Sequence, residues 1–328
     1  MILVSGASGF LGRHLVGYLS GQGVEIRALY HSHAPGSVLR GLSGVTWVRC
    51  DLLDVFEVEE AMQGVTDVYH CAGIVTYNVK RHEEMLHFNP ESTANIVNQA
   101  LAQGIRKLVY VSSIAALGRS GNRSNKELTE DEEWSDSSYN SAYGLSKYLA
   151  EMEVWRGVGE GLNAVIVNPG IILGECKEHD PPFPLLKIAY NEFPFYTKGV
   201  TSWVGMDDVV KTMVLLMGSD ISAERFIVSG GNLGFREVFS RLAVALNKRP
   251  PRYLAGAFMT GLVWRWGRLR NMFGGSQSAI IKETAMNANL CCYYNNEKLP
   301  RFLPGFTYTP IGHSIDRMAR SFINSNEK

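Results

Sequence analysis

The chain begins with Met1-Ile-Leu-Val-Ser-Gly-Ala-Ser-Gly-Phe-Leu-Gly12, in which an apolar run leads into glycines that are spaced three residues apart. The apolar run predicts a buried strand, and the apolar periodicity over 11–19 predicts a helix. Gly6 allows a sharp turn off the strand, Gly9 allows backbone N–H groups to approach a phosphate, and Gly12 allows close helix packing. The sequence therefore predicts a strand, a phosphate-binding loop and a helix.

The position of the glycines favours a dinucleotide site over a plain structural turn. Their spacing departs from the common Gly-x-Gly-x-x-Gly pattern, and a glycine-rich turn is often only a turn. However, this turn joins a strand to a helix, and the N-terminus of a helix carries partial positive charge that favours phosphate. We expect the cofactor to contact Gly6, Ser8, Gly9, Phe10, Leu11 and Gly12.

Composition limits the class of protein. The 328 residues are 45% hydrophobic, which is enough for one large α/β domain with an added lobe. The 32 basic residues balance the 32 acidic ones, so no overall field favours nucleic acid, and we expect a small-molecule substrate. An odd number of cysteines, without Cys-x-x-Cys spacing, predicts reduced thiols, and the histidines show no metal-ligand spacing.

Targeting signals and large apolar segments were also sought. The first predicted strand starts at Met1, and no apolar run approaches the ~20 residues that span a bilayer. We therefore expect no signal peptide and a cytoplasmic protein. Association into a homodimer is left open.

Strand and helix patterns alternate along the first half of the chain. Helices are predicted over 83–102 and 139–155, and strands over 24–30, 46–50, 67–71, 105–112 and 164–168. This alternation predicts right-handed crossovers and a Rossmann-type, doubly wound parallel α/β sheet. We expect a dinucleotide-binding domain over 1–170, to which the chain returns around 199–229, and a smaller, mostly C-terminal substrate lobe over 171–198 and 230–328.

The end of the second predicted strand bears on the choice of cofactor. An acidic residue there would bind the ribose hydroxyls of NAD and repel a 2′-phosphate, but the chain has His31-Ser32-His33. His31 and Ser32 are able to donate hydrogen bonds to that phosphate, and Arg13 adds a nearby charge. NADP is the preferred expectation, and a permissive strand end that accepts NAD equally is the alternative.

Two further strand ends offer cofactor contacts. Asp51 and Leu52 follow the third predicted strand, where a carboxylate and a backbone N–H group are able to meet adenine. The alternative is that Asp51 only starts a loop, because Asp54 is the better helix cap. Ala72 and Gly73 follow the fourth strand and are small enough to let the cofactor pass.

Tyr143 and Lys147 are the strongest candidates for chemistry. A spacing of four residues places both side chains on one face of the helix predicted over 139–155. A neighbouring ammonium lowers the pKa of a phenol, which otherwise lies near 10. Ser113 follows a strand at the edge where α/β sheets bind ligands. Tyr139 lacks such a partner, because the residue four positions later is Tyr143.

Further motifs complete the pattern. They are His70-Cys-Ala-Gly, Asn89-Pro-Glu-Ser-Thr-Ala-Asn95, Val111-Ser-Ser-Ile-Ala-Ala-Leu-Gly118, Tyr143-Gly-Leu-Ser-Lys-Tyr-Leu-Ala-Glu151, Asn168-Pro-Gly and Trp203-Val-Gly-Met-Asp-Asp-Val209. With the glycine loop they resemble the extended short-chain dehydrogenase/reductases of the NAD-dependent epimerase/dehydratase superfamily, and are most similar to dihydroflavonol 4-reductase-like proteins. The resemblance covers nearly the whole chain and is specific for the superfamily but not for a substrate.

The resemblance implies roles for individual residues. Ser113 would polarise the substrate oxygen, Tyr143 would exchange its proton, and Lys147 would tune Tyr143 and hold the nicotinamide ribose. Pro169 and Ile172 would line the nicotinamide pocket.

Three functions remain open at this stage. The first is an NAD(P)-dependent reductase or dehydrogenase that acts on a carbonyl or secondary alcohol of a small apolar or aromatic substrate. The second is a sugar or nucleotide-sugar epimerase or dehydratase, although the stretch over 197–204 lacks the arginine that typically grips a diphosphate. The third is a catalytically silent protein that senses dinucleotides.

The second half of the chain gives weaker signals. Phe193, Phe195 and Tyr196 line a pocket for a flat ligand or belong to ordinary core. The Asp207-Asp208 pair resembles an acid–base pair but is better explained as a helix cap. The apolar and aromatic segment 254–270, with its arginines, lies on a membrane surface or forms a lid or core helix of the substrate lobe.

Overall fold

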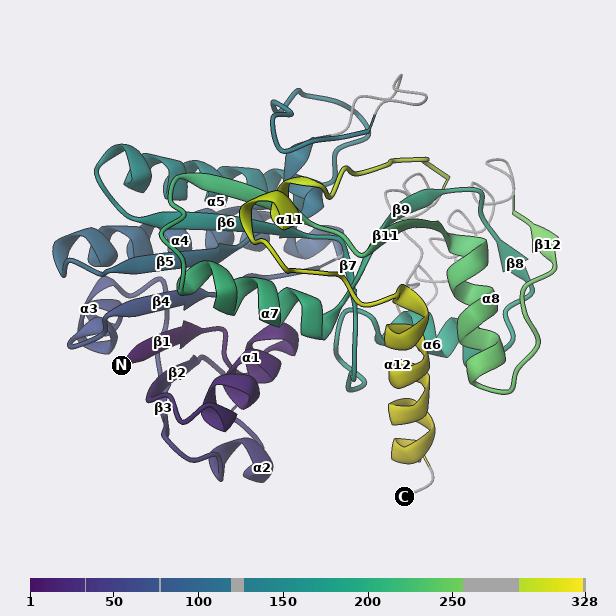
Figure 1. The fold of residues 1–328 in the computed structure, drawn as a ribbon, viewed down its shortest axis with the longest axis horizontal. Helices are drawn as coiled ribbons and strands as arrows, with labels where there is room; N and C mark the ends of the chain where they lie inside the picture. The colour runs from purple at the N-terminus through teal and green to yellow at the C-terminus, as the bar shows by residue number, and fades with distance from the viewer. Residues whose placement is uncertain (33, 77, 119–126, 256–288, 327–328) are drawn as a thin grey trace.

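The computed structural model describes residues 1–32, 34–76, 78–118, 127–255 and 289–326. Its centre is a seven-stranded sheet in the order β10-β6-β5-β4-β1-β2-β3, in which all neighbouring strands are parallel (Figure 1). The strands are β1 (Ile2–Ser5), β2 (Ile26–Tyr30), β3 (Val45–Arg49), β4 (Asp67–His70), β5 (Lys107–Val111), β6 (Ala164–Pro169) and β10 (Glu224–Val228). The expectation of a doubly wound parallel sheet is confirmed.

Helices cover both faces of this sheet. They are α1 (Phe10–Gly21), α2 (Ser37–Arg40), α3 (Val55–Met62), α4 (His82–Ala102), α5 (Ala142–Gly159) and α7 (Met206–Met217), with short 3₁₀ turns η1 (Val79–Arg81) and η2 (Ile114–Leu117). Helices α1 and α7 share one apolar core with the sheet, and α3, α4 and α5 share the core on the opposite face. Strands β4, β5 and β6 are buried at every position, as expected for parallel strands that are covered on both sides.

The sheet order reverses between β1 and β4, since β1 pairs with β2 on one side and with β4 on the other. Ligands bind at such a reversal, outside the carboxyl ends of the strands. The loops that follow β1, β4 and β5 carry the glycine loop, Ala72 and Ser113. The fold therefore brings the predicted site residues to one edge.

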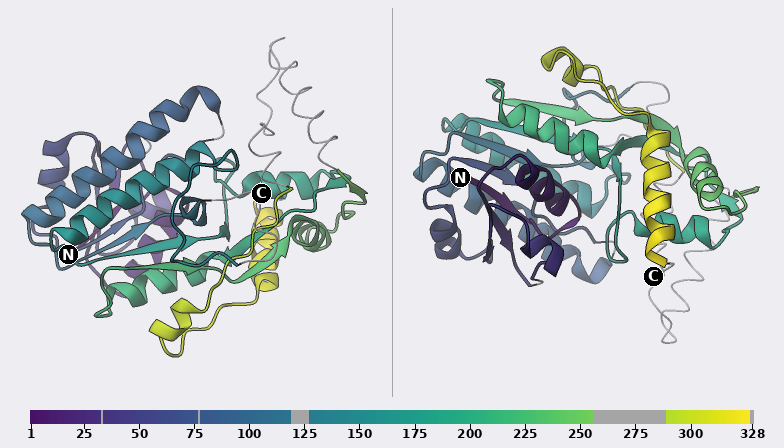
Figure 2. Two further views of the ribbon diagram at one scale, coloured as in Figure 1. Left: turned by 90° about the horizontal axis from the view of Figure 1, so that it is seen from above. Right: turned by 60° about the horizontal axis from the view of Figure 1, so that its bottom comes forward.

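A second lobe contains two small sheets and its own apolar core. The sheets join β7 (Ile171–Leu173), β9 (Val200–Gly205) and β11 (Gly231–Gly234), and β8 (Phe195–Tyr196) with β12 (Tyr253–Leu254). The helices are α6 (Phe183–Tyr190), α8 (Phe235–Ala245) and α12 (Ile311–Asn326), whereas α11 (Lys298–Phe302) packs against β10 and the core of the large sheet. Helices α6, α8 and α12 pack around Trp203 of β9, and Figure 2 shows α12 beside this lobe.

The chain over 199–229 divides between the two sheets. Strand β9 pairs with β7 and β11 in the small sheet, whereas α7 and β10 return to the large one. The sequence pattern did not show that β9 joins the small sheet while α7 and β10 pack with the large one.

The prediction that Asp207 and Asp208 cap a helix is wrong. Helix α7 has Gly205 as its N-cap, and both carboxylates lie in its first turn. Asp208 accepts hydrogen bonds from the backbone N–H and the hydroxyl of Thr309, each at 2.9 Å, and Asp207 pairs with Arg317. The two carboxylates therefore join α7 to the C-terminal segment.

Several expectations concern cysteines, metals and membranes. The cysteines are free thiols, and the described ranges hold no cluster of His, Cys, Asp and Glu side chains that is able to bind a metal. In the same ranges no helix has the length and apolar character needed to cross a membrane. His33 and most of the segment 254–270 lie outside the described residues, so the alternatives for that segment stay open.

Candidate active site

The glycine loop has the geometry that its sequence predicts. Gly6 has a φ of +63°, and a Cβ atom there would come within 2.7 Å of the Ala72 backbone. A Cβ atom on Gly12 would overlap the carbonyl oxygen of Gly6. Both positions therefore require glycine, one for its turn and one for the close contact between α1 and β1.

The N-terminus of α1 fits a pyrophosphate. Gly9 is the N-cap, no side chain caps the first turn, and that turn contains no acidic residue. The N–H groups of this turn and the helix dipole are thus available to an anion. Ser8 and Phe10 are partly buried beside them, while Leu11 packs into the core.

The expectation that Arg13 reaches a 2′-phosphate is wrong in this structure. Its guanidinium forms a two-pronged ion pair with Asp180, and both side chains are only about a tenth exposed. Because Asp180 lies in the loop after β7, the pair ties α1 to the second lobe. His31 and Ser32 are exposed at the end of β2, and His31 lies 3.8 Å from Asp51.

Asp51 and Leu52 lie at the carboxyl end of β3, as predicted. The Asp51 carboxylate accepts a hydrogen bond from the Leu53 N–H at 3.0 Å, and its own N–H donates to Glu57 at 2.6 Å. The side chain of Asp54 caps α3, so the capping role was assigned correctly. The Asp51 side chain remains partly exposed and is able to meet a ligand.

The elements that carry Ser113, Tyr143 and Lys147 are brought together by a close contact between η2 and α5. The Ser113 hydroxyl caps η2 by accepting from the Ala115 N–H at 3.2 Å. A Cβ atom on Gly144 would lie 2.6 Å from the Ala115 carbonyl oxygen, so a larger residue there would push the two elements apart. Helix α5 begins at Ala142, because the hydroxyl of Ser141 accepts from the Gly144 N–H.

Lys147 is buried among groups of the neighbouring strand. Its ammonium donates to the Val111 carbonyl at 2.8 Å and to the Tyr110 hydroxyl at 3.4 Å, and the side chain is 4% exposed. Burial lowers the pKa of Lys147 to about 8, against the opposing influence of Cys71 and Glu151. Tyr143 is partly buried and close enough to raise the pKa of Tyr110.

Gly73 lies directly against this ammonium. A Cβ atom on Gly73 would come within 3.0 Å of the Lys147 Nζ atom. The predicted passage for the cofactor beside Ala72 and Gly73 thus runs past the proposed catalytic lysine. Pro169 ends β6 in a buried position and Ile172 is half-buried in β7. The roles assigned to all these residues stay predictions.

Asn89 is a positioning residue that the sequence reasoning did not single out. It is 2% exposed, accepts from the Ile74 N–H at 2.7 Å, and donates to the Ser146 hydroxyl at 2.9 Å. Ser146 donates to the carbonyl of Tyr143 at 2.8 Å. The sequence signal that could have revealed it is a polar residue on the apolar face of the helix predicted over 83–102.

Glu151, a buried carboxylate, is linked to the backbone of Ser113 through Asn168. Asn168 donates both to Glu151 at 2.6 Å and to the Ser113 carbonyl at 3.0 Å, and Arg225 lies 3.3 Å from Glu151. Burial is the largest cause that raises the pKa of Glu151, while Arg225 and Asn168 act against it. Glu151 lies four residues after Lys147, which is one helical turn.

Comparison with known proteins agrees with this geometry. The model of the NAD dependent epimerase/dehydratase family matches residues 2–228. The chain is 29% identical over 254 residues to sterol demethylase protein B of Methylococcus capsulatus, covering 76% of each chain. It is also 29% identical over 262 residues to a putative dihydroflavonol 4-reductase of Synechocystis, covering 76% of this chain and 73% of the relative.

Solved structures share the fold over nearly the whole chain. The crystal structure of gox2253 has a TM-score of 0.83 at 26% identity, and the match covers 99% of this chain and 98% of that one. The dTDP-glucose 4,6-dehydratase DesIV of Streptomyces venezuelae, with NAD bound, has a TM-score of 0.80 at 17% identity and covers 100% of this chain and 98% of its own, which shows a common fold alone. The chain thus belongs to the NAD-dependent epimerase/dehydratase family, within the extended short-chain dehydrogenase/reductase superfamily.

Proposed function

We propose that this protein is an NAD(P)-dependent reductase that acts on the carbonyl group of a small apolar or aromatic compound. The observation that carries the proposal is the buried ammonium of Lys147, placed beside Gly73 and one helical turn after Tyr143. A buried cation there favours the phenolate form of Tyr143, which a proton donor and acceptor needs near neutral pH.

Ser113, Tyr143 and Lys147 have different roles in the proposed reduction. Bound NAD(P)H would supply the hydride. Ser113 donates a hydrogen bond to the carbonyl oxygen of the substrate, and Tyr143 gives its phenolic proton to the same oxygen. Lys147 stabilises the phenolate that remains until a proton returns from water.

Named relatives are consistent with a reductase. The chain is 27% identical to cinnamoyl-CoA reductase 1 of Petunia hybrida over 69% of its length, and that match covers 72% of the relative. It is 30% identical to a dTDP-4-dehydro-6-deoxy-D-allose reductase of Streptomyces, covering 82% of that enzyme. Reduction of a carbonyl is common to these names, whereas their substrates differ.

The aromatic side chains of the second lobe support the substrate class less directly than Lys147 supports the reaction type. Phe193 and Phe195 contact each other edge to face with ring centroids 5.6 Å apart, and Phe195 also contacts Tyr253 at 5.9 Å. Figure 1 shows β8 and β12 at the outer end of the second lobe. A shallow cavity of about 470 Å³ lies at the start of α5, and its lining combines the apolar Trp134, Ala142 and Leu145 with serine, asparagine and aspartate side chains.

Purified protein tests the reaction class. Incubation with aliphatic and aromatic aldehydes and ketones in the presence of NADPH or NADH should oxidise the cofactor and yield the alcohol. Cofactor should exchange freely during gel filtration. Tightly retained cofactor together with interconversion of sugar epimers would instead establish the epimerase or dehydratase alternative. Micromolar cofactor binding without turnover of any substrate would establish a silent sensor.

We further propose that NADPH binds more tightly than NADH, by a modest margin. No acidic residue ends β2, and His31 and Ser32 are exposed there. Because Asp180 engages Arg13, we attribute the preference to His31 and Ser32. Titration of tryptophan fluorescence with each cofactor at pH 6 and pH 8 measures it, and tighter NADH binding at both values would contradict it.

A further inference from the structure

A chain of buried polar groups runs from Lys147 to the glycine loop. Tyr110 and His70 are fully buried, their rings lie 5.4 Å apart, and Thr93 is 1% exposed between them. The Tyr110 hydroxyl contacts the Thr93 hydroxyl, His70 Nε2 lies 3.0 Å from Thr93 Oγ1, and His70 Nδ1 lies 2.6 Å from Ser5 Oγ. The groups come from α4, α5 and three adjacent strands.

The donors and acceptors of this chain have one consistent assignment. The Asn89 carbonyl only accepts, so the Thr93 hydroxyl must donate to it across their 2.7 Å contact. Thr93 Oγ1 then accepts from the Nε2–H group of His70, which leaves Nδ1 to accept from Ser5. A neutral imidazole fits this pattern, and burial lowers the pKa of His70 to about 3.

The Tyr110 hydroxyl is oriented by the same reasoning. The Lys147 ammonium has no lone pair, so Tyr110 Oη accepts from it and must direct its own proton toward Thr93. The other end of the chain, Ser5, accepts from the Ala72 N–H at 3.3 Å and directly precedes Gly6. The network therefore connects the glycine loop to the lysine through groups that each have a fixed direction.

The ammonium itself is held at two points. The Val111 carbonyl and the Tyr110 hydroxyl accept two of its three N–H bonds, which fixes the third direction because the group is tetrahedral. The ionisable groups that face it are Tyr110 from β5, His70 and Cys71 from β4 and its end, and Tyr143 and Glu151 from α5. His70 stays neutral, and burial raises the pKa of the Cys71 thiol to about 12.

We propose that Tyr110 is a positioning residue for Lys147, held in its orientation by Thr93 and the neutral imidazole of His70. The inference rests on the proposed function, because it assigns Lys147 a chemical task. Without the Tyr110 hydroxyl the ammonium loses an acceptor, so its charged form becomes less favourable and its third N–H bond is no longer held in one direction.

Tyr110→Phe tests this proposal by two readouts. NMR titration of the Lys147 side chain, identified by the signal missing in Lys147→Met, should show its pKa lowered by about half a unit to one unit. The alkaline limb of the pH profile of kcat/KM should move by the same amount, so that kcat/KM above pH 8 falls about three- to tenfold. Tyr69→Phe is the matched control, since Tyr69 is buried on the adjacent strand but packs into the core on the opposite face.

Thr93 variants separate orientation from simple loss of volume. Thr93→Val removes the hydroxyl and should produce a smaller shift in the same direction, whereas Thr93→Ser keeps it and should restore the wild-type titration. Unchanged Lys147 titration in both Tyr110→Phe and Thr93→Val would overturn the proposal. If the wild-type protein reduces no carbonyl compound, the proposed function fails, yet the NMR titration still decides whether Tyr110 positions the ammonium.

Discussion

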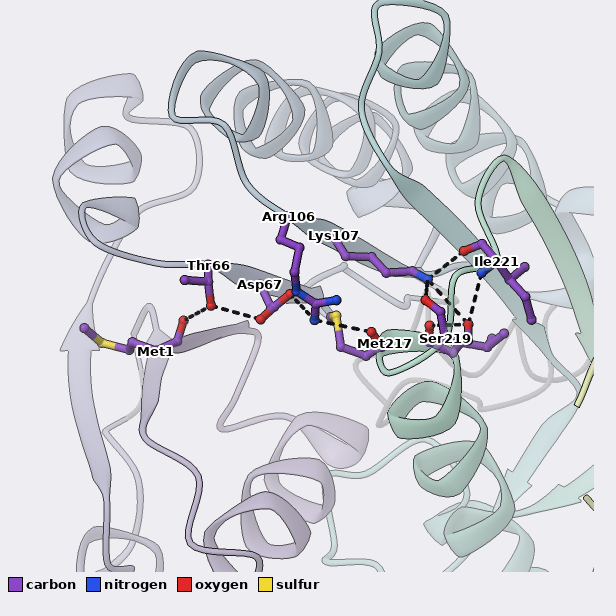
Figure 3. Close-up of polar contacts among 9 residues, drawn as sticks. Met1, Thr66, Asp67, Arg106, Lys107, Met217, Ser219 and Ile221 are labelled. Atoms are coloured by element: carbon purple, nitrogen blue, oxygen red, sulfur yellow. Dashed lines mark hydrogen bonds and ion pairs between the residues drawn. The ribbon is translucent and has the colours of Figure 1, made fainter.

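Two buried lysines, Lys107 and Lys147, lie near opposite ends of strand β5 and have different surroundings. Lys107 begins β5, is fully buried, and donates to the carbonyls of Ser219 and Ile221 at 2.7 and 2.6 Å and to the Ser219 hydroxyl at 3.5 Å. Next to it Arg106 donates to the Met217 carbonyl at 3.3 Å (Figure 3). These carbonyls belong to the end of α7 and the loop after it, where cations are favourable.

Lys147 faces the other edge with fewer acceptors. Its hydrogen bonds go to one carbonyl, at Val111, and to one hydroxyl, at Tyr110. On its remaining side lies Gly73, whose missing side chain leaves room beside the Nζ atom.

The comparison shows that a buried lysine can join two elements, as Lys107 does, or leave an N–H bond available at a site, as Lys147 does. Both lysines have a lowered pKa caused mainly by burial, so a lowered pKa alone does not identify a catalytic group. The number of acceptors does distinguish them. The hydrogen bonds of Lys107 join β5 to the end of α7. Lys147 keeps one N–H bond, which we propose serves Tyr143 and a cofactor ribose.

Replacing Lys147 should have the largest effect. We expect Lys147→Met to lower kcat for carbonyl reduction about 10³-fold, because the phenolate of Tyr143 loses its cation. The free energy of unfolding should change by less than about 1 kcal/mol, since removal of a buried charge offsets the loss of the hydrogen bonds to Val111 and Tyr110. Steady-state kinetics and urea unfolding measure the two quantities. A stability loss as large as that of Lys107→Met would remove the distinction.

Lys107→Met is the reciprocal variant. The part-buried carbonyls of Ser219 and Ile221 lose their partner, so the free energy of unfolding should fall by about 2 to 3 kcal/mol, while kcat stays near the wild-type value. Urea unfolding followed by circular dichroism tests the first expectation. A fall in kcat without a loss of stability would show that the amino edge also serves catalysis.

The pH dependence of activity should follow Lys147. Its pKa of about 8 means that the ammonium loses its proton as the pH rises through that value. Above it, kcat/KM should fall about tenfold per pH unit. Stability has the opposite sign, because above pH 8 the unfolded chain retains this proton more strongly, so this group raises the free energy of unfolding with pH. A flat kcat/KM profile between pH 7 and 9.5 would exclude Lys147 from the rate-determining chemistry.

Local patterns were sufficient for the large sheet and for the residues at its carboxyl edge. The glycine spacing, the apolar strands and the four-residue spacing of Tyr143 and Lys147 are each visible within a few positions of the chain. Parallel strands then bring their ends together without further information. Ser113 was placed for the same reason, since it lies two residues after β5.

Interactions between distant segments could not be predicted. Arg13 is followed 167 residues later by its partner Asp180, and nothing near either residue indicates the pair. Asn89 and Glu151 are buried polar residues of helices, and their burial depends on packing against distant segments. Strand β9 joins the small sheet because of pairing with β7 and β11, which depends on the packing of the whole second lobe.

Tyr143→Phe tests the central claim most directly, and Tyr139→Phe, three residues before α5 begins, is its matched control. Turnover of a carbonyl substrate and the dissociation constant of NADPH are measured in both variants. We predict that Tyr143→Phe lowers kcat about 10²- to 10⁴-fold and leaves the dissociation constant of NADPH within about twofold of the wild-type value, whereas Tyr139→Phe retains both. Equal turnover in Tyr143→Phe and the wild-type protein would contradict the account.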